Sequence, residues 1–236
     1  GRTDGTDKMI QHNFRNIKKK KKKNDFGIHF CWLEGVLNCT YDWIHINFDD
    51  DWIEPTFAEK LYSLTSPETG FVFCNVKMYE EKDGIFNSVN YFSEQSGHYK
   101  SLRFERLFSD DYAISPGCTL LRKKIMLDCI FGGDIPLSKT QYKGVGSDML
   151  FTLLPLNKYP NVGFINENLA IFRSHQKSIT VKSFQNDNKT KQIKAAYREA
   201  KKLYFLSKLD LSYKQILFLL NLKQKWKKMC DLLKIR

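Results

Sequence analysis

The period of the hydrophobic pattern changes along the chain, so that strand-like and helix-like segments alternate. Residues 25–30 (DFGIHF) predict a short strand, and in residues 42–48 apolar side chains alternate with polar ones, as in a half-buried strand. Residues 70–79 (GFVFCNVKMY) are apolar almost throughout, which predicts a strand in the middle of a covered sheet. Residues 161–175 predict two further short strands.

Apolar residues three and four apart predict helices between and after these strands. This spacing occurs in residues 10–17, with Thr6 or Asp4 as a cap, and again in residues 32–37. The lysine run 18–23 between them is expected to be a solvated segment; binding of anionic lipid or polyphosphate is the alternative.

Further helices are expected along the rest of the chain. In residues 56–64, Thr56 and Glu59 have the spacing of a capping box at the start of an apolar stripe. From residue 188 the pattern is purely helical, with one helix over residues 189–206 and a second over residues 212–235.

The remaining segments complete an alternation of strands and helices. Residues 80–110 predict a long loop or a hairpin excursion, and residues 112–127 predict a strand, a Ser-Pro-Gly turn and then a strand or helix. This order indicates an α/β domain followed by an α-helical C-terminal extension. We expect the domain to cover residues 1–180 and the extension to cover residues 181–236.

Composition narrows the class of protein. The chain has 236 residues, of which 42% are hydrophobic and 14% aromatic, and this is typical of a folded globular protein. No apolar run reaches the roughly 18 residues of a membrane span. The six cysteines show no paired or zinc-like spacing, which predicts free thiols in a reducing compartment.

The charge is unevenly placed. The net charge is +12, to which the lysine run 18–23 contributes six and residues 182–236 contribute eleven, so the rest of the chain carries −5. A nucleic-acid-binding domain is expected to carry a basic face of its own. The mildly acidic body therefore argues against nucleic acid as a partner.

Three consecutive carboxylates, Asp49, Asp50 and Asp51, end the alternating segment 42–48. Adjacent carboxylates repel one another, and a cation would neutralise them. Ligands of open α/β sheets bind beyond the carboxyl ends of strands, and hard oxygen ligands suit Mg²⁺ or Mn²⁺, which also bind substrate phosphates. The alternative is a solvated turn before the helix that begins near residue 56.

Two more segments carry chemistry. In GVGSDML, Asp148 lies at the start of a helix after a glycine-rich loop, where backbone amides can approach a ligand. The alternative is a helix cap formed by Ser147 or Asp148. In FRSHQKSIT, His175 directly follows an apolar strand and has either a binding role or a structural one.

The order of these segments resembles the family 2 glycosyltransferases. The segments are FDDDWIEP, YAISPGCTLLRK, GVGSDML and NENLAIFRSHQKSIT, and GRTDGT at the start resembles the end of that family's DDGSTDGT segment. The resemblance runs from Gly1 to about Thr180. It implies the GT-A fold, a Rossmann-like mixed sheet flanked by helices, and the transfer of a sugar from a nucleotide-sugar to a glycan or lipid-linked acceptor.

The resemblance also implies a metal site. Asp49, Asp50 and Asp51 correspond to the metal and nucleotide motif of the family, with Asp51 as a ligand of Mg²⁺ or Mn²⁺ and with Asp49 or Asp50 binding the metal or the ribose. His175 corresponds to a position that closes the metal and diphosphate site. The usual motif is D-x-D-D, and Phe48 stands where some members have the first Asp, so more than one assignment of the ligands is open.

Further roles follow from the same resemblance. Asp4 lies in the segment that binds the nucleotide, and Ser115 and Gly117 line the floor where donor and acceptor meet. Asp148 corresponds to the general base that acts on the acceptor hydroxyl. A carboxylate within hydrogen-bond reach of that hydroxyl could accept its proton, and a single base opposite the leaving group implies inversion at the anomeric carbon.

Two expectations concern the setting of the reaction. The family's first strand, first helix and second strand precede GRTDGT and are not part of this chain, so it is either a fragment of an enzyme or an inactive member that binds glycan or membrane. The basic amphipathic helix over residues 212–235, with Trp226, is suited to an anionic membrane; the alternative is that its apolar stripe packs on the domain or pairs with another subunit. We expect a cytoplasmic protein of surface-polysaccharide synthesis, peripheral at the inner face of the plasma membrane.

Overall fold

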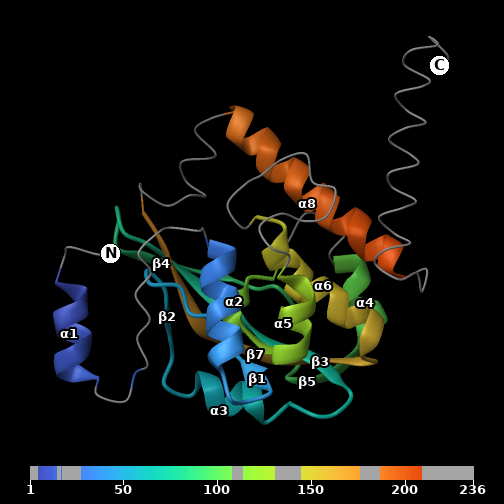
Figure 1. Ribbon diagram of the computed structural model, residues 1–236, viewed down its shortest axis with the longest axis horizontal. Coiled ribbons are helices and arrows are strands. Elements are labelled where there is room, and N and C mark those ends of the chain that lie inside the picture. Colours follow the sequence, from blue (N-terminus) through green and yellow to red (C-terminus); the bar gives the residue numbers. More distant parts are fainter. Residues whose placement is uncertain are drawn as a thin grey trace.

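The fold is a curled mixed sheet flanked by helices (Figure 1). The structure is a computed structural model and describes residues 5–14, 17, 28–107, 114–130, 145–175 and 187–208. Within these residues seven strands form one sheet with the order β1-β6-β3-β7-β2, and β4 pairs with β3 while β5 pairs with β7. Among these pairs β3 and β7 are parallel and the others are antiparallel. The mixed α/β class predicted from the sequence is confirmed.

The strands are β1 (Trp43–Ile44), β2 (Trp52–Ile53), β3 (Thr69–Glu80), β4 (Ile85–Val89), β5 (Gly97–Lys100), β6 (Thr119–Arg122) and β7 (Asn161–Ser174). The helices are α1 (Thr6–Asn13), α2 (Ile28–Asn38), α3 (Phe57–Tyr62), α4 (Ser101–Leu107), α5 (Lys123–Cys129), α6 (Ser147–Lys158) and α8 (Asp187–Ser207), and a 3₁₀ turn, η2, covers Pro116–Cys118.

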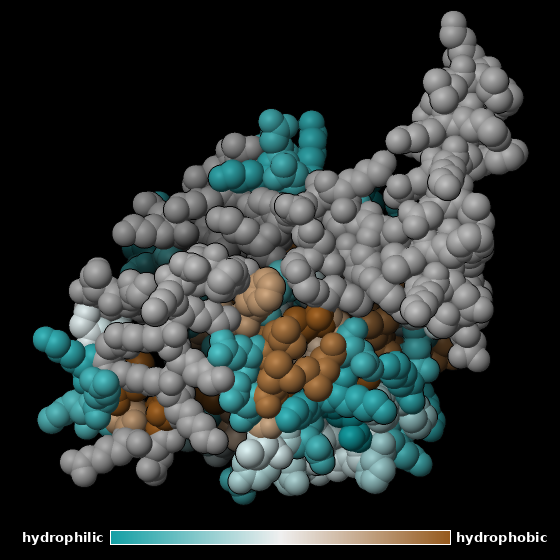
Figure 2. Space-filling model, in the orientation of Figure 1, coloured by the Kyte–Doolittle hydropathy of each residue, from teal (hydrophilic) through white to brown (hydrophobic). Residues whose placement is uncertain are grey.

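Strand β3 is the centre of the core, as its apolar sequence predicts. It lies between β6 and β7, and its first eight residues are buried. The ring of Phe73 packs 4.9 Å from that of Phe164 on β7 and 5.5 Å from that of Phe104 on α4, centroid to centroid. On the face seen in Figure 2, hydrophobic side chains gather over α2 and α5 and are framed by hydrophilic ones.

Strand β7 is one strand of 14 residues, whereas the sequence predicts two short ones. Its pairing with β3 is irregular around Asn75, where the register shifts. The buried Asn75 amide donates to Asn166 Oδ1 at 3.0 Å and to the carbonyl of Phe92 at 3.2 Å, and its oxygen accepts from the N–H of Tyr91 at 2.9 Å. Because this side chain bonds to the polar middle of β7, the strand continues through the segment that separates its two apolar halves.

Two strand predictions near the start are wrong in part. Residues 28–30 are helical, because Ile28, Trp32 and Val36 are four residues apart and form one apolar stripe of α2; residues 25–27 lie outside the described part. In residues 42–48 only Trp43 and Ile44 pair with another strand. Ile44, Ile46 and Phe48 pack on the core as predicted, but Trp43 and His45 next to Ile44 are also half-buried, so the predicted alternation of burial is present only in part.

The predicted positions of the helices agree more closely with the structure than the predicted capping interactions do. The start of α6 and the span of α8 agree with the predictions, and α3 begins after Thr56, but the Thr56 side chain makes no capping hydrogen bond. Gly5, not Thr6 or Asp4, occupies the cap of α1, in a left-handed conformation with φ of 83°. The helix predicted for residues 212–235 lies outside the described residues.

The segments predicted as irregular contain regular structure. The excursion of residues 80–110 includes the β3–β4 hairpin, strand β5 and helix α4. In residues 114–130 the Ser-Pro-Gly turn is η2, followed by β6 and then α5, while the strand expected before the turn is not formed at Ile114. None of the helices in the described ranges is long and apolar enough to cross a membrane.

Helix α8 shares the core of the sheet domain. Its residues Ala196, Ala200, Leu203 and Tyr204 are buried, and α8 packs on α6. The side-chain amide of Asn157 on α6 donates to Ser207 Oγ at 2.6 Å. The domain boundary predicted near residue 180 falls among residues that the structure does not describe.

Arg122, at the end of β6, fixes the loop that leads into β3. Its Nε donates to the carbonyl of Thr69 at 2.7 Å, and its Nη2 donates to the carbonyl of Ser66. The guanidinium carbon lies 4.5 Å from the ring centroid of Trp43 and 4.6 Å from that of Tyr159. The planar guanidinium therefore donates hydrogen bonds to the loop carbonyls and at the same time stacks on two aromatic rings.

We expect Arg122→Lys to lower the free energy of unfolding by about 1–3 kcal/mol, because an ammonium cannot make the paired bonds and both stacking contacts. Urea unfolding followed by circular dichroism measures the change. Arg198→Lys, on the exposed side of α8, is the matched control and should stay within about 0.5 kcal/mol of wild type. Equal stability of the two variants would contradict this role for Arg122.

Candidate functional site

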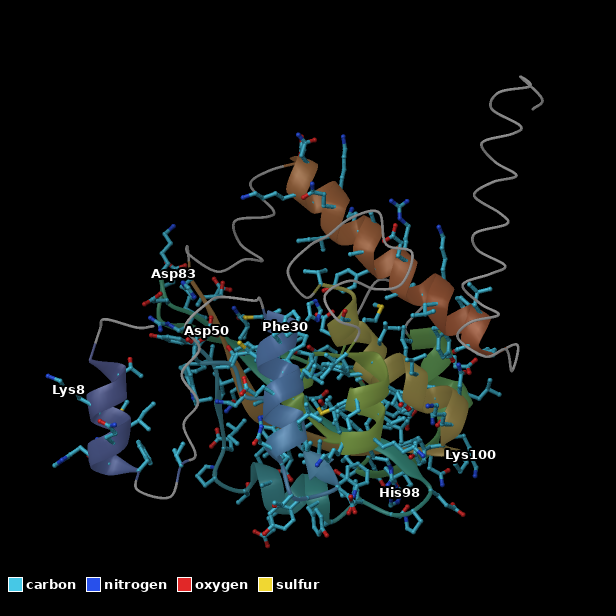
Figure 3. The ribbon with its side chains drawn as sticks, in the orientation of Figure 1. Lys8, Phe30, Asp50, Asp83, His98 and Lys100 are labelled. Carbon is cyan, nitrogen blue, oxygen red and sulfur yellow. The ribbon has the colours of Figure 1, made fainter. Side chains whose placement is uncertain are left out.

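The pairing of β2 with β7 brings the aspartate triplet to the end of β7. Trp52 pairs with Ile171 in an antiparallel register, so residues before β2 run beside residues that follow position 171. Asp51 Oδ1 accepts a hydrogen bond of 3.0 Å from the N–H of Arg173. Asp50 Oδ2 and His175 Nε2 are 3.2 Å apart. Two motifs more than 100 positions apart therefore form one site at the sheet edge, where Figure 3 labels Asp50.

The environment of the triplet disfavours negative charge. Burial and, to a smaller extent, the charge of Asp50 raise the pKa of Asp51 to about 6, although the Arg173 N–H and His175 act in the opposite direction. The Arg173 guanidinium forms an ion pair with Glu81, and this pairing raises the pKa of Arg173. A cation placed between the carboxylates would relieve their repulsion.

The residues fit a divalent cation that is also held by a substrate. In the described ranges, no three His, Cys, Asp or Glu side chains are grouped so that they would hold a metal by themselves. Mg²⁺ is commonly bound through one or two carboxylates together with substrate phosphates. The structure offers Asp50 with His175, the neighbouring Asp51, and the exposed Asp49. His175 Nε2 lies 3.2 Å from Asp50 Oδ2, and the charge of His175 also acts on Asp51.

The turn at Ser115 lies against this site. A Cβ atom on Gly117 would lie 2.9 Å from Cε1 of Phe172 on β7 and 3.4 Å from Cδ2 of Phe48, so only glycine lets the turn come this close. Ser115 Oγ accepts a hydrogen bond of 3.2 Å from the Gly117 N–H, and Ser115 is itself half-exposed. Turn η2 also contacts α6 and therefore connects the triplet with the helix that carries Asp148.

Asp148 lies in the first turn of α6 and is partly buried. Gly146, with φ of 92°, occupies the cap position, so neither Ser147 nor Asp148 is the capping residue. Asp148 Oδ1 accepts from the N–H of Gly146 at 2.8 Å and from that of Met149 at 2.9 Å. Burial raises the pKa of Asp148 to about 6 even though these two bonds act in the opposite direction.

Some residues of the site have little or no signal in the sequence. Arg173, which fixes Asp51 through its backbone, precedes His175 by two positions, and its strand position was the available signal. The contact of Phe48 and Phe172 with Gly117 depends on strand pairing and has no local signal. Asp4, predicted to bind the nucleotide, lies outside the described residues.

Comparisons with known proteins add no family to this geometry. No family model matches the sequence, and a search of curated proteins finds no significantly similar one. The function is therefore argued from the site.

We expect Asp148→Asn to raise stability at neutral pH. A carboxyl with a pKa near 6 when folded and 3.8 when unfolded favours folding most below pH 3.8, and this contribution is lost as the pH rises through 6. The amide cannot ionise and its oxygen can accept the same two bonds. At pH 7.5 the free energy of unfolding should rise by on the order of 1–3 kcal/mol, and the gain should vanish near pH 4.

Chemical denaturation at the two pH values measures this difference. Asp83→Asn, in the exposed β3–β4 turn, is the control and should change stability little at either pH. A variant less stable than wild type at pH 7.5 would show that the Asp148 charge is not strained by its surroundings.

Proposed function

We propose that the chain carries the site of a glycosyltransferase with the GT-A fold, which moves a sugar from a nucleotide-sugar to a hydroxyl of a glycan or lipid-linked acceptor. One observation carries the proposal: Asp50, Asp51 and His175 meet at one end of β7, beside the turn that contains Gly117. The order of the four motifs along the chain supports the same activity.

The triplet and His175 would hold Mg²⁺ or Mn²⁺ together with the diphosphate of the donor. The bound metal supplies positive charge that stabilises the diphosphate as a leaving group. The protein orients the ligands: the Arg173 N–H fixes one oxygen of Asp51, and His175 fixes Asp50. Gly117 allows the turn to close the site from the side of Phe48 and Phe172.

Asp148 would accept the proton of the acceptor hydroxyl. A pKa near 6 leaves the carboxylate ionised at neutral pH and makes it a stronger base than an ordinary aspartate. The two N–H groups that bind Oδ1 hold the carboxylate in one orientation. A single base of this kind implies one displacement with inversion of the anomeric carbon.

A second candidate function is binding: the chain would be a catalytically inactive protein of the same fold that binds glycan or an anionic membrane. The outer side of α8 favours it, because Lys191, Lys194, Arg198 and Lys202 are exposed there and nitrogen-tipped side chains project from this helix (Figure 3). A peripheral position at the membrane is compatible with either function, and surface-polysaccharide synthesis is the setting we propose for the enzyme.

Binding of nucleoside diphosphates separates these functions. We expect UDP or GDP to bind only with Mn²⁺ or Mg²⁺ present, and Asp51→Asn to weaken binding at least about tenfold because a metal ligand is lost. Isothermal titration with and without EDTA measures both effects. Asp83→Asn, another acidic residue on the side of the molecule where Figure 3 labels Asp50, should leave binding unchanged.

Two results would contradict the enzyme. Nucleotide binding that is insensitive to EDTA and to Asp51→Asn would contradict the proposed metal site. Absence of nucleotide binding together with adsorption to anionic vesicles would favour the second function. If a product is isolated, a retained anomeric configuration would exclude the single displacement.

A further inference from the structure

Helices α6 and α8 lie side by side and run in the same direction (Figure 1). Near their ends, Asn157 on α6 donates to the carbonyl of Tyr204 at 3.4 Å and to Ser207 Oγ at 2.6 Å. Asp148 precedes Asn157 by nine residues, and Tyr197 precedes Tyr204 by seven. At about 1.5 Å per residue, these spans are about 14 and 10 Å long, so Tyr197 lies opposite the first turn of α6.

Tyr197 is on the face of α8 that meets α6. It precedes the buried Ala200 by three residues and the buried Tyr204 by seven, a spacing that places all three on one side of a helix. The small side chains of Ala196 and Ala200, both buried, let the two helices approach closely. Tyr197 itself is half-buried and packs against the core.

The electrostatics agree with this placement. Burial raises the pKa of Tyr197 first, and the negative charge of Asp148 raises it further. The phenol therefore stays neutral at physiological pH. A neutral ring next to a carboxylate excludes water from it without supplying a compensating charge.

Charged groups on the other elements packed against α6 have partners elsewhere. Glu105 and Arg103 on α4 pair with Lys208 and Glu94, Asp128 on α5 pairs with Lys158, and Lys123 on α5 donates to the carbonyl of Cys39. The other titratable groups on the neighbouring elements are Lys124 on α5, the thiols of Cys74, Cys118 and Cys129, Lys77, Tyr79 and Glu80 on β3, and Asp187, Lys189, Lys191, Lys194, Arg198, Glu199, Lys201, Lys202 and Tyr204 on α8. Lys124, Lys194 and Arg198 are exposed, and Cys129 donates to the carbonyl of Leu150.

We propose that Tyr197 is a positioning residue of the site, whose ring covers the Asp148 carboxylate from the α8 side and keeps water away from it. The catalytic meaning of this contact rests on the proposed function, whereas the contact itself does not. A residue beyond the predicted boundary at 180 would then help to set the proton affinity of the base.

Carbon-13 NMR titration of Asp148, in protein labelled at aspartate carboxyl groups, tests the proposal. The Asp148 signal is identified by its loss in Asp148→Asn. We expect wild type and Tyr197→Phe to share one midpoint, because both keep the ring, and Tyr197→Ala to titrate at least about one pH unit lower, because water reaches the carboxylate. Phe205→Ala, which removes an exposed ring from the same helix, should match wild type.

A wild-type midpoint in folded Tyr197→Ala, or an equal fall in Phe205→Ala, would overturn the proposal. If Tyr197→Ala does not fold, Tyr197→Gln replaces the ring with a smaller, polar side chain that lets water reach the carboxylate and should also lower the midpoint, and a wild-type midpoint in that variant would overturn the proposal equally.

Titration with UDP and Mn²⁺ on the same samples separates this inference from the proposed function. Wild type and the Tyr197 variants should bind alike, since Tyr197 lies at α6 and not at the triplet. A lowered Asp148 midpoint without nucleotide binding in any sample would support the contact and contradict the enzyme. Nucleotide binding together with an unchanged Asp148 midpoint in Tyr197→Ala would support the enzyme and contradict the contact.

Discussion

The pairing of β7 with β3 on one side and β2 on the other is the interaction on which the site depends. Asn75 keeps β7 continuous through its polar middle, and β2 then pairs with the far half of the strand. Strand β2 has only two residues, so its register is also fixed outside the strand, by the bond from the Glu54 N–H to the Leu169 carbonyl and by that from the Arg173 N–H to Asp51. A shift of one residue would turn the triplet side chains to the opposite face.

The two carboxylates at the centre of the proposed chemistry are both unfavourable for the fold at neutral pH. Asp51 and Asp148 lie in different elements, yet burial raises the pKa of each to about 6. Strained ionisable groups of this kind are concentrated at functional sites, although structural networks also produce them. The buried thiols differ, since burial raises the pKa of Cys129 far above neutral pH and keeps it an unreactive part of the core.

Much of this could be predicted from the sequence where the signal is local. The apolar run of β3, the start of α6 and the span of α8 follow from composition and period, and so does the position of each acidic motif. Long-range pairing has no such signal: the contact of His175 with Asp50 depends on the register of β2. The error at residues 28–30 is of another kind, because a short apolar run fits a strand and a helix equally well.

Helix α8 determines where the chain could be truncated or fused to another protein without disrupting the core. The sequence alone separates residues 181–236 as an appendage, but Ala200, Leu203 and Tyr204 belong to the same buried cluster as β3 and β7. Removing the helix would expose the side of α6 that it covers, the helix whose first turn carries Asp148. The smallest self-sufficient unit of this protein therefore extends at least through Ser207, and a fusion or truncation designed at residue 180 would divide a core and not a linker.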